Sequence, residues 1–416
     1  MALASLVERV LGGDLPVAVE AYDGSRAGPD DAETTIVVRS PDALHRAITA
    51  PGELGLARAY VAGDLDVKGS IWPVLELRDR MPNVRLERRA MLDLVRELGG
   101  VRKVRRMPPP PEEVGAVGLR RHGRRHSKAR DAAAIRHHYD VSNDFYRLVL
   151  GPSLTYSCAV FHDPSDSLEQ AQANKYELIC RKLGLEPGMR LLDVGCGWGG
   201  MVIHAAKHHG VQAVGVTVSK QQVELAAKRV AEEGLSETVE IRLQDYRDVT
   251  DGPYDAISSI GMFEHVGEAK LAEYFGRLRS LLPRGGRLLN HGINRLPGRK
   301  ARMAQRGFIN RYVFPDGELH EAGRVVSAIQ NAGFEMRHVE GLREHYALTL
   351  QRWVANLESN WEAAVADAGE GRARVWRLYM AGSAMNFERG LTHIHQVLAV
   401  PRTDDGYSGL PLRPAF

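Results

Sequence analysis

A glycine-rich stretch, LLDVGCGWGG at residues 191–200, has the composition of a cofactor-binding turn. Apolar residues at 189–194 predict a short buried strand, and the apolar periodicity from Met201 predicts a helix. Glycines at 195, 197, 199 and 200 would let the backbone approach a ligand closely, with the first amides of the helix directed at it. The stretch therefore predicts a site for a nucleotide-like cofactor on a Rossmann-type sheet.

The glycine spacing does not by itself identify the cofactor, because it fits both G-x-G-x-x-G and G-x-G-x-G. A dinucleotide site requires an acidic residue about 20 positions further on, which holds the ribose hydroxyls. The second predicted strand, at 211–216, is instead followed by Thr217, Val218 and Ser219. This disfavours NAD, and a purely structural turn stays the alternative while the motif is considered alone.

The elements around this turn alternate between strands and helices. The pattern predicts strands at 190–194, 211–216, 239–243, 254–260 and 286–291, and helices at 144–150, 167–183, 201–209, 219–233 and 268–281. Such alternation is typical of a parallel, doubly wound α/β sheet, whose ligand lies at the carboxyl ends of the strands. The residues expected at those ends are Gly195, Thr217, Asp245, Gly261 and His291.

Length and composition set broad limits on the protein. A chain of 416 residues, 44% apolar and 26% charged, can form two or three globular domains. No apolar run approaches the roughly 18 residues of a membrane span, and residues 1–9 lack the pattern of a secretory signal. Three cysteines are too few for a disulfide framework and have no metal-type spacing. We therefore expect a cytoplasmic protein without a metal site.

Three regions are predicted along the chain. Residues 1–100 predict a small α+β domain, with strands near 17–21 and 34–38, that contacts lipid or dimerises. Residues 101–130 form a basic, proline-rich linker. Its charge suits either plain solvation or an anionic surface, such as nucleic acid or phospholipid headgroups. Residues 131–416 form the large α/β domain.

Further short motifs occur in a fixed order around the glycine loop. They are HHYDVSNDFY (137–146), YSCAVF (156–161), VTVSKQQ (216–222), QDYRD (244–248), GMFEHVG (261–267) and YVFPDG (312–317). Together they resemble the cyclopropane-fatty-acid synthase family, which includes the mycolic-acid cyclopropane and methyl-branching enzymes. The resemblance extends from about residue 135 to near residue 400. It implies a Rossmann-like class I methyltransferase sheet with helical insertions.

The resemblance implies S-adenosylmethionine as the cofactor. The glycine loop would receive its amino-acid end, Thr217 and Gln222 its ribose, and Asp245 and Tyr246 its adenine, so the missing acid after the second strand becomes an expected feature. The full set of implied cofactor residues is Tyr139, Tyr156, Ser157, Asp193, Gly195, Gly197, Gly199, Thr217, Gln222, Gln244, Asp245 and Tyr246.

The implied reaction transfers a methyl carbon to the cis double bond of an unsaturated phospholipid acyl chain. An alkene is a weak nucleophile and yields a carbocation, so the site must exclude water and hold the methyl group close. Loss of a proton to a bound bicarbonate then closes a cyclopropane ring. The residues that match the family's bicarbonate site are Cys158, Glu264, His291, Ile293 (through its backbone) and Tyr346.

One strand departs from the family pattern LHTIG. Residues 288–295 are LLNHGINR, so His291 and Ile293 match, whereas Asn290, Gly292 and Asn294 differ. A hydride shift in the same cation would give a mid-chain methylene branch instead of a cyclopropane, and this product is kept as the alternative. Other classes kept open are a small-molecule or nucleic-acid methyltransferase and a non-catalytic lipid-binding protein. We expect no nucleic-acid partner, peripheral binding to the anionic inner face of the membrane, and an oligomeric state that includes the option of a homodimer.

Overall fold

The computed structural model describes residues 2–13, 15–80, 88–113, 130, 141–298, 307–314 and 317–416. These residues fall into two units. Unit 1 contains residues 1–115, 304–315 and 361–382, and unit 2 contains residues 116–303, 316–360 and 383–416. Two segments that follow the predicted sheet in sequence therefore belong to unit 1. The division of roles at residues 100 and 130 stays a prediction, and most of the predicted linker lies outside the described residues.

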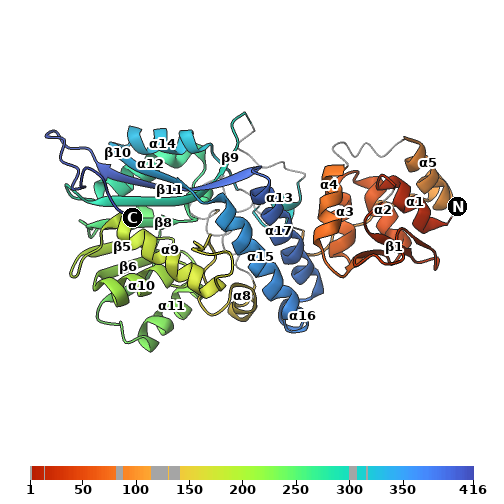
Figure 1. Cartoon of the computed structure of the whole chain (residues 1–416), viewed down its shortest axis with the longest axis horizontal. Helices are drawn as coiled ribbons and strands as arrows, with labels where there is room; N and C mark the ends of the chain where they lie inside the picture. The colour runs from red at the N-terminus through yellow and green to blue at the C-terminus, as the bar shows by residue number, and fades with distance from the viewer. Residues whose placement is uncertain are drawn as a thin grey trace. The chain divides into compact units, whose positions relative to one another are not determined.

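Unit 2 is built on a seven-stranded sheet with the order β10-β11-β9-β8-β5-β6-β7 (Figure 1). The strands are β5 (Arg190–Val194), β6 (Gln212–Thr217), β7 (Val239–Leu243), β8 (Ala256–Ile260), β9 (Arg287–Arg295), β10 (Phe334–Gly341) and β11 (Thr392–Pro401). Strands β5 to β9 pair in parallel, as the alternating pattern predicts. Strand β11 pairs antiparallel with both β9 and β10, and neither its direction nor β10 follows from that pattern.

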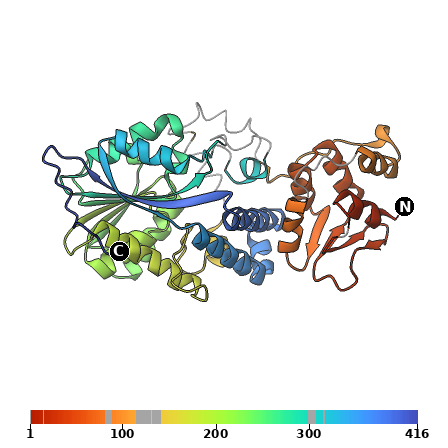
Figure 2. The same ribbon diagram turned by 45° about the horizontal axis from the view of Figure 1, so that its top comes forward.

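Helices cover both faces of this sheet because successive strand residues point to opposite sides. Leu191 packs in a cluster with α9 (Leu168–Leu183), α10 (Gly200–His209) and α11 (Lys220–Glu232). Leu192, the next residue, packs with α12 (Leu271–Ser280) and α14 (Ala322–Asn331) on the other face (Figure 2). The remaining helices of this unit include α8 (Asn143–Leu150) and α15 (Arg343–Ser359). The predicted Rossmann-like fold is confirmed.

The chain order reverses at β5. Strands β6 and β7 lie on one side of β5, and β8 and β9 lie on the other. The loops that leave β5 and β8 therefore diverge, and a crevice forms at their carboxyl ends, where open α/β sheets bind ligands. The glycine-rich stretch follows β5 directly and lies at this reversal point.

Unit 1 contains a four-stranded sheet with the order β2-β1-β3-β4. Its strands are β1 (Ala18–Ala21), β2 (Arg26–Ala27), β3 (Thr35–Val38) and β4 (Leu65–Lys68), and its helices are α1 (Leu3–Val10), α2 (Pro41–Thr49), α3 (Glu53–Val61), α4 (Trp72–Arg80), α5 (Arg88–Glu97), α13 (Phe308–Tyr312) and α16 (Trp361–Ala368). Most of α17 (Glu370–Glu388) also belongs to this unit. Among the described residues of either unit, none forms a helix that is long and apolar enough to span a membrane.

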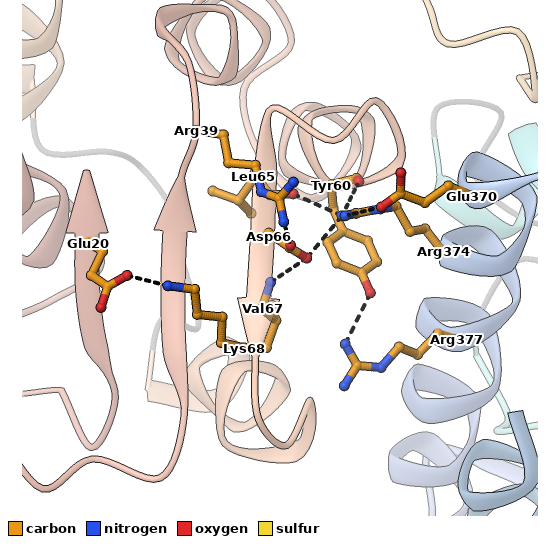
Figure 3. A network of polar contacts seen from close by, with 10 residues as sticks. All are labelled: Glu20, Arg39, Tyr60, Leu65, Asp66, Val67, Lys68, Glu370, Arg374 and Arg377. Carbon is orange, nitrogen blue, oxygen red and sulfur yellow. Dashed lines mark hydrogen bonds and ion pairs between the residues drawn. The ribbon is translucent and has the colours of Figure 1, made fainter. Parts of the chain in front are cut away.

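A buried arginine attaches α17 to the small sheet (Figure 3). Arg374 is 3% exposed, and its guanidinium donates to the carbonyl oxygens of Tyr60 and Leu65 at 3.1 and 3.2 Å. It also lies 3.1 Å from the Asp66 carboxylate and 2.8 Å from that of Glu370. One turn on, Arg377 donates to the Tyr60 hydroxyl at 3.3 Å. Segment 361–382 therefore folds as part of the small unit.

Replacing Arg374 with Met is expected to lower the free energy of unfolding by roughly 3 kcal/mol, because it leaves the carbonyl groups of Tyr60 and Leu65 without this donor and removes one of the two arginines that pair with Asp66. Urea unfolding followed by fluorescence measures this effect. Arg372→Met, at a less buried site on the same helix, is the matched control. Equal stability of the two variants would show that the buried contacts contribute little.

Candidate active site

A recess opens at the carboxyl ends of β5, β6, β7 and β8, where the chain order reverses. It contains about 860 Å³ of space free of protein atoms, part of it open solvent. The predicted cofactor residues that line it are Gly195, Gly197, Thr217, Gln222, Gln244, Asp245 and Tyr246.

The glycine loop borders this recess in a conformation that requires glycine. Gly195 and Gly197 have φ values of +81° and +54°, in the left-handed region that other residues rarely adopt. A Cβ on Gly197 would meet no atom of the described residues within 4 Å. The amides of Gly195 and Cys196 donate to the carbonyl of Val216 at 2.9 and 3.1 Å, which fixes the loop against β6.

Polar side chains along the opposite wall are already held by neighbours. The Thr217 hydroxyl donates to Gln222 Oε1 at 2.7 Å, which leaves the amide group of that glutamine as a donor for a ligand. Asp245 accepts two hydrogen bonds from the Arg247 guanidinium, at 2.6 and 2.7 Å. The Tyr246 ring packs edge-on against Tyr274, with centroids 4.8 Å apart. These contacts hold the three side chains in place at the recess.

Four other predicted cofactor residues do not line the recess. Gly199 caps the start of α10, and Tyr156 stacks on Trp353 with ring centroids 5.4 Å apart. Asp193 is buried on β5 and accepts from the Ser258 hydroxyl at 2.6 Å; burial raises its pKa to about 6. Ser157 accepts a hydrogen bond from the buried Lys175, and Tyr139 lies outside the described residues.

Sequence reasoning missed a buried lysine on α9. Lys175 is 1% exposed, and its Nζ donates to Ser157 Oγ at 3.1 Å. When Lys175 is charged, its ammonium group only donates, so the Ser157 hydroxyl proton points elsewhere and can serve a ligand. Burial lowers the pKa of Lys175 to about 7, opposed by the negative charge of Asp193. The missed signal is its place on the core-facing stripe of α9, with Leu168, Gln172, Ile179 and Lys182.

Glu264 and Ile293, predicted to act together, are brought together. Glu264 Oε1 accepts from the Ile293 amide at 2.8 Å. Its second oxygen, Oε2, is buried and has no hydrogen-bond partner among the described residues. Burial raises the pKa of this carboxyl to about 7, although the Ile293 amide acts in the opposite direction. Glu264 therefore holds an acidic proton near neutral pH and has an oxygen left for a ligand.

The proton position on His291 is fixed by a chain of hydrogen bonds. Lys182 Nζ donates to Gln396 Oε1 at 2.7 Å, so the amide nitrogen of Gln396 faces His291 and donates to its Nδ1 at 3.0 Å. Burial lowers the pKa of His291 well below its usual value, so the ring is neutral. Its proton therefore lies on Nε2, a buried donor without a partner in the described part of the chain.

Cys158 and Tyr346, the other two predicted catalytic residues, both contact the carbonyl oxygen of Leu342. Cys158 Sγ lies 3.7 Å from the Leu342 oxygen, which also accepts from the Tyr346 amide at 3.2 Å. Burial raises the pKa of the Cys158 thiol, which is therefore neutral. The Tyr346 ring packs against Phe387 and Trp353. A neutral thiol is consistent with contact to a ligand rather than nucleophilic attack.

The residues that depart from the family pattern on β9 have structural reasons. A Cβ on Gly292 would lie 1.8 Å from the Phe263 ring, so only glycine fits beneath it. Asn294 Oδ1 accepts from His395 Nδ1 at 2.8 Å. Asn290 is 1% exposed, and its Oδ1 has no hydrogen-bond partner among the described residues. Gly292 and Asn290, which flank His291 on β9, are therefore the departures nearest the predicted catalytic residues.

Comparison with known proteins agrees with this geometry. The family profile described as mycolic acid cyclopropane synthetase matches residues 126–397. The chain belongs to this family. It is 50% identical over 408 residues to a probable fatty acid methyltransferase of Mycobacterium tuberculosis, covering 97% of this chain and 95% of the relative. It is 37% identical to the cyclopropane-fatty-acyl-phospholipid synthase of Escherichia coli over 281 residues, covering 67% of this chain and 71% of the relative.

A solved member of the family has the same fold. The mycolic acid cyclopropane synthase CmaA1, solved with SAH and CTAB, superposes with a TM-score of 0.60 at 35% identity, covering 64% of this chain and 97% of that one. SAH is the demethylated form of S-adenosylmethionine. The chain is therefore an S-adenosylmethionine-dependent methyltransferase of the cyclopropane synthetase family, and the sequence-based assignment to this family is confirmed.

Proposed function

We propose that this methyltransferase acts on the cis double bond of an unsaturated acyl chain of a phospholipid and forms a cyclopropane with bicarbonate as the base. The observation that carries the proposal is the pair of unpartnered buried groups at Glu264 and His291. They stand beside the cofactor recess, since Gly261, Met262 and His265 line it. The named acceptors of the relatives, fatty acids and fatty-acyl phospholipid, supply the substrate class.

The cofactor fits the recess by the chemistry of its walls. The open space at Gly197 admits the amino-acid end of S-adenosylmethionine, and the Gln222 amide is a donor for ribose oxygens. When bound, the cofactor supplies an electrophilic methyl group. The residues of the protein exclude water and orient the acceptor.

A small oxyanion also fits the residues present. The Nε2 proton of His291 is a donor for its oxygens, and the buried Oε2 of Glu264 can accept the hydrogen of the anion when the carboxyl is ionised. The Tyr346 hydroxyl and the Cys158 thiol are further candidate donors. When bound, bicarbonate supplies a base for the proton that the product must lose. The role of Glu264 is then to hold the hydrogen of that anion and turn its basic oxygen away.

The alternative product is a mid-chain methylene branch, formed when a hydride shift precedes proton loss. The specific observation that favours it is the altered strand β9, where Phe263 covers Gly292 and the Asn290 amide is buried. These changes lie beside the groups that hold the base. A displaced base would remove the proton of the transferred methyl more slowly, so the neighbouring hydride could shift first. Loss of a methyl proton from the rearranged cation then gives the methylene branch.

The deciding experiment incubates the protein with S-adenosylmethionine and vesicles of cis-monounsaturated phospholipid. Mass spectrometry should show the gain of one CH₂ on the acyl chain. Proton NMR then separates the products, since cyclopropane ring protons and vinylidene protons differ. No gain of mass, with cofactor binding intact, would rule out the lipid acceptor.

The tautomer of His291 gives a sharper test of the anion site. Gln396→Glu replaces the amide donor with an acceptor, so the His291 proton should move to Nδ1 and the Nε2 donor should disappear. We expect kcat to fall about 100-fold, with little change in cofactor affinity. The ¹⁵N NMR shifts of the ring report the tautomer, and Gln330→Glu, on the surface of α14, is the control. Full activity with the altered tautomer would eliminate the proposed role of His291.

We also propose that the basic segment after residue 100 attracts an anionic membrane surface. Arg102, Lys103, Arg105 and Arg106 are all exposed. Removing Arg105 and Arg106 should weaken binding to phosphatidylglycerol vesicles by about 30-fold, at roughly 1 kcal/mol for each charge near the surface. Vesicle sedimentation measures this, with Lys220→Ser/Lys228→Ser on α11 as the control pair. Equal binding of both double variants, or no dependence on salt, would contradict it.

A further inference from the structure

A cluster of side chains that could bind a metal lies between α9 and α10, and none of them lines the cofactor recess. Cys180 comes from α9, and His204 and His209 come from α10. Their ligand atoms all lie within 4.8 Å of one another. The two helices lie side by side against the same face of the sheet (Figure 1). The sequence did not predict this cluster, because its members are separated along the chain and only the helix packing unites them.

A fourth group completes the set. The Glu177 carboxylate, one turn before Cys180 on α9, lies 3.0 Å from His209 Nε2 and 3.6 Å from His204 Nε2. Residues three apart on a helix share a face, so Glu177 and Cys180 are both directed at α10. One sulfur, two imidazole nitrogens and a carboxylate oxygen are thereby gathered around one point.

Two of these groups have atoms left for a metal ion. His204 Nε2 is buried and has no hydrogen-bond partner among the described residues. Arg181 Nε donates to Glu177 Oε1 at 2.8 Å, while Glu177 Oε2 lies next to the two histidines.

We propose that Glu177, Cys180, His204 and His209 bind a divalent zinc ion that joins α9 to α10. This donor set matches the tetrahedral sulfur, nitrogen and oxygen coordination that zinc prefers. At ordinary zinc–ligand bond lengths the donor atoms stand about 3.3–3.8 Å apart, so small side-chain rotations close the present spread. Binding replaces the Cys180 S–H bond with a Zn–S bond and releases one proton to solvent.

The position of the cluster indicates a structural role near the cofactor loop. His204 is one turn from Gly200, where α10 begins after that loop. The His204 ring also lies 5.6 Å from the Tyr176 ring, whose hydroxyl is 2.7 Å from Thr155 Oγ1. An ion between the helices would therefore fix the start of α10 and the segment that carries Ser157 and Cys158. All four ligands would be protein groups, which is typical of structural rather than catalytic zinc.

Cobalt(II) is the probe for this site, because cobalt bound to a thiolate gives an intense charge-transfer absorption. The full chain, stripped with EDTA, should bind one equivalent of Co²⁺ with this absorption, and Zn²⁺ should displace it. Cys180→Ser should abolish the absorption and weaken Zn²⁺ binding by at least about tenfold, and His204→Ala should do the same. His208→Ala is the matched control: its ring lies 4.5 Å from that of His204, yet it is outside the proposed set.

Two results would overturn the proposal. The first is weak or non-stoichiometric metal binding by the unaltered chain, which would mean that Glu177 only forms ion pairs with the histidines. The second is an unchanged absorption in Cys180→Ser or its loss in His208→Ala, which would place the metal elsewhere. X-ray absorption of the zinc-loaded native protein gives the ligand shell without any variant, so the test holds even if a variant fails to fold. One sulfur in that shell would support the site, and none would refute it.

Discussion

Replacing Glu264 with Gln is expected to lower kcat by about 10²–10⁴-fold, the range for loss of a group that manages a proton. Cofactor affinity should change little. The introduced glutamine keeps an oxygen that can accept from the Ile293 amide, now 2.8 Å from Glu264 Oε1, so the backbone stays in place. What disappears is the exchangeable carboxyl proton. Single-turnover kinetics and calorimetric titration with S-adenosylmethionine measure the two effects separately.

The same substitution should stabilise the protein in alkaline solution. The pKa of Glu264 is about 7 in the folded protein, above its ordinary 4.5, because the buried site disfavours the charged form. Folding stability is therefore highest while the carboxyl is neutral, and this contribution is lost as pH rises from about 4.5 through 7. Glutamine stays neutral, so Glu264→Gln should unfold at higher urea concentration than the native chain at pH 8, by up to roughly 3 kcal/mol.

The two proteins should have similar stability near pH 4.5. Glu232→Gln, at an exposed position on α11, should change neither kcat nor this pH dependence. Parallel loss of cofactor affinity and turnover in Glu264→Gln would instead mark Glu264 as a cofactor-binding residue. A pH-independent stability difference would contradict the burial of a titrating carboxyl.

Local pattern was enough to predict the parallel part of the fold. Alternating apolar residues and glycine turns mark β5 to β9, since each strand and its helix are contiguous in sequence. Strand β11 lies outside this rule: it returns antiparallel between β9 and β10 from almost 100 residues after β9, and only long-range pairing fixes its place. Segment 361–382 has the same character, because its attachment to unit 1 rests on the contacts of Arg374 with residues over 300 positions away.

The candidate site also contains some residues that local sequence pattern predicts and others that it does not. Gly195, Thr217 and Asp245 follow strand ends, so topology alone brings them to one recess. Lys175 and the Lys182–Gln396 pair could not be assigned a role, because a lysine in a helix pattern is usually exposed and its buried partners come from distant segments. The metal-ligand cluster depends on the packing of α9 on α10. Motifs thus predict candidate binding residues, whereas the groups that position them emerge only in three dimensions.

Substituting Val for Gly197 should reduce cofactor affinity by at least about 100-fold, which corresponds to roughly 2.7 kcal/mol. A side chain here meets no protein atom within 4 Å, so the fold itself has room for it. This space belongs to the recess that Gly197 lines, so the added methyl groups would occupy the place of the cofactor. The positive φ of +54° adds backbone strain of roughly 1–3 kcal/mol.

The effect of backbone strain can be separated from the effect of blocking the cofactor, because the chain contains a second glycine with a similar conformation. Gly234 has φ +70°, also meets no protein atom within 4 Å, and lies after α11, away from the recess. Gly234→Val should therefore lose comparable stability and keep its affinity for S-adenosylmethionine, whereas Gly197→Val should lose both. Urea unfolding and calorimetric titration of the two variants give the four values required. Native affinity in a folded Gly197→Val protein would mean that the cofactor binds elsewhere, because a β-branched side chain and a closely approaching ligand cannot share the same space.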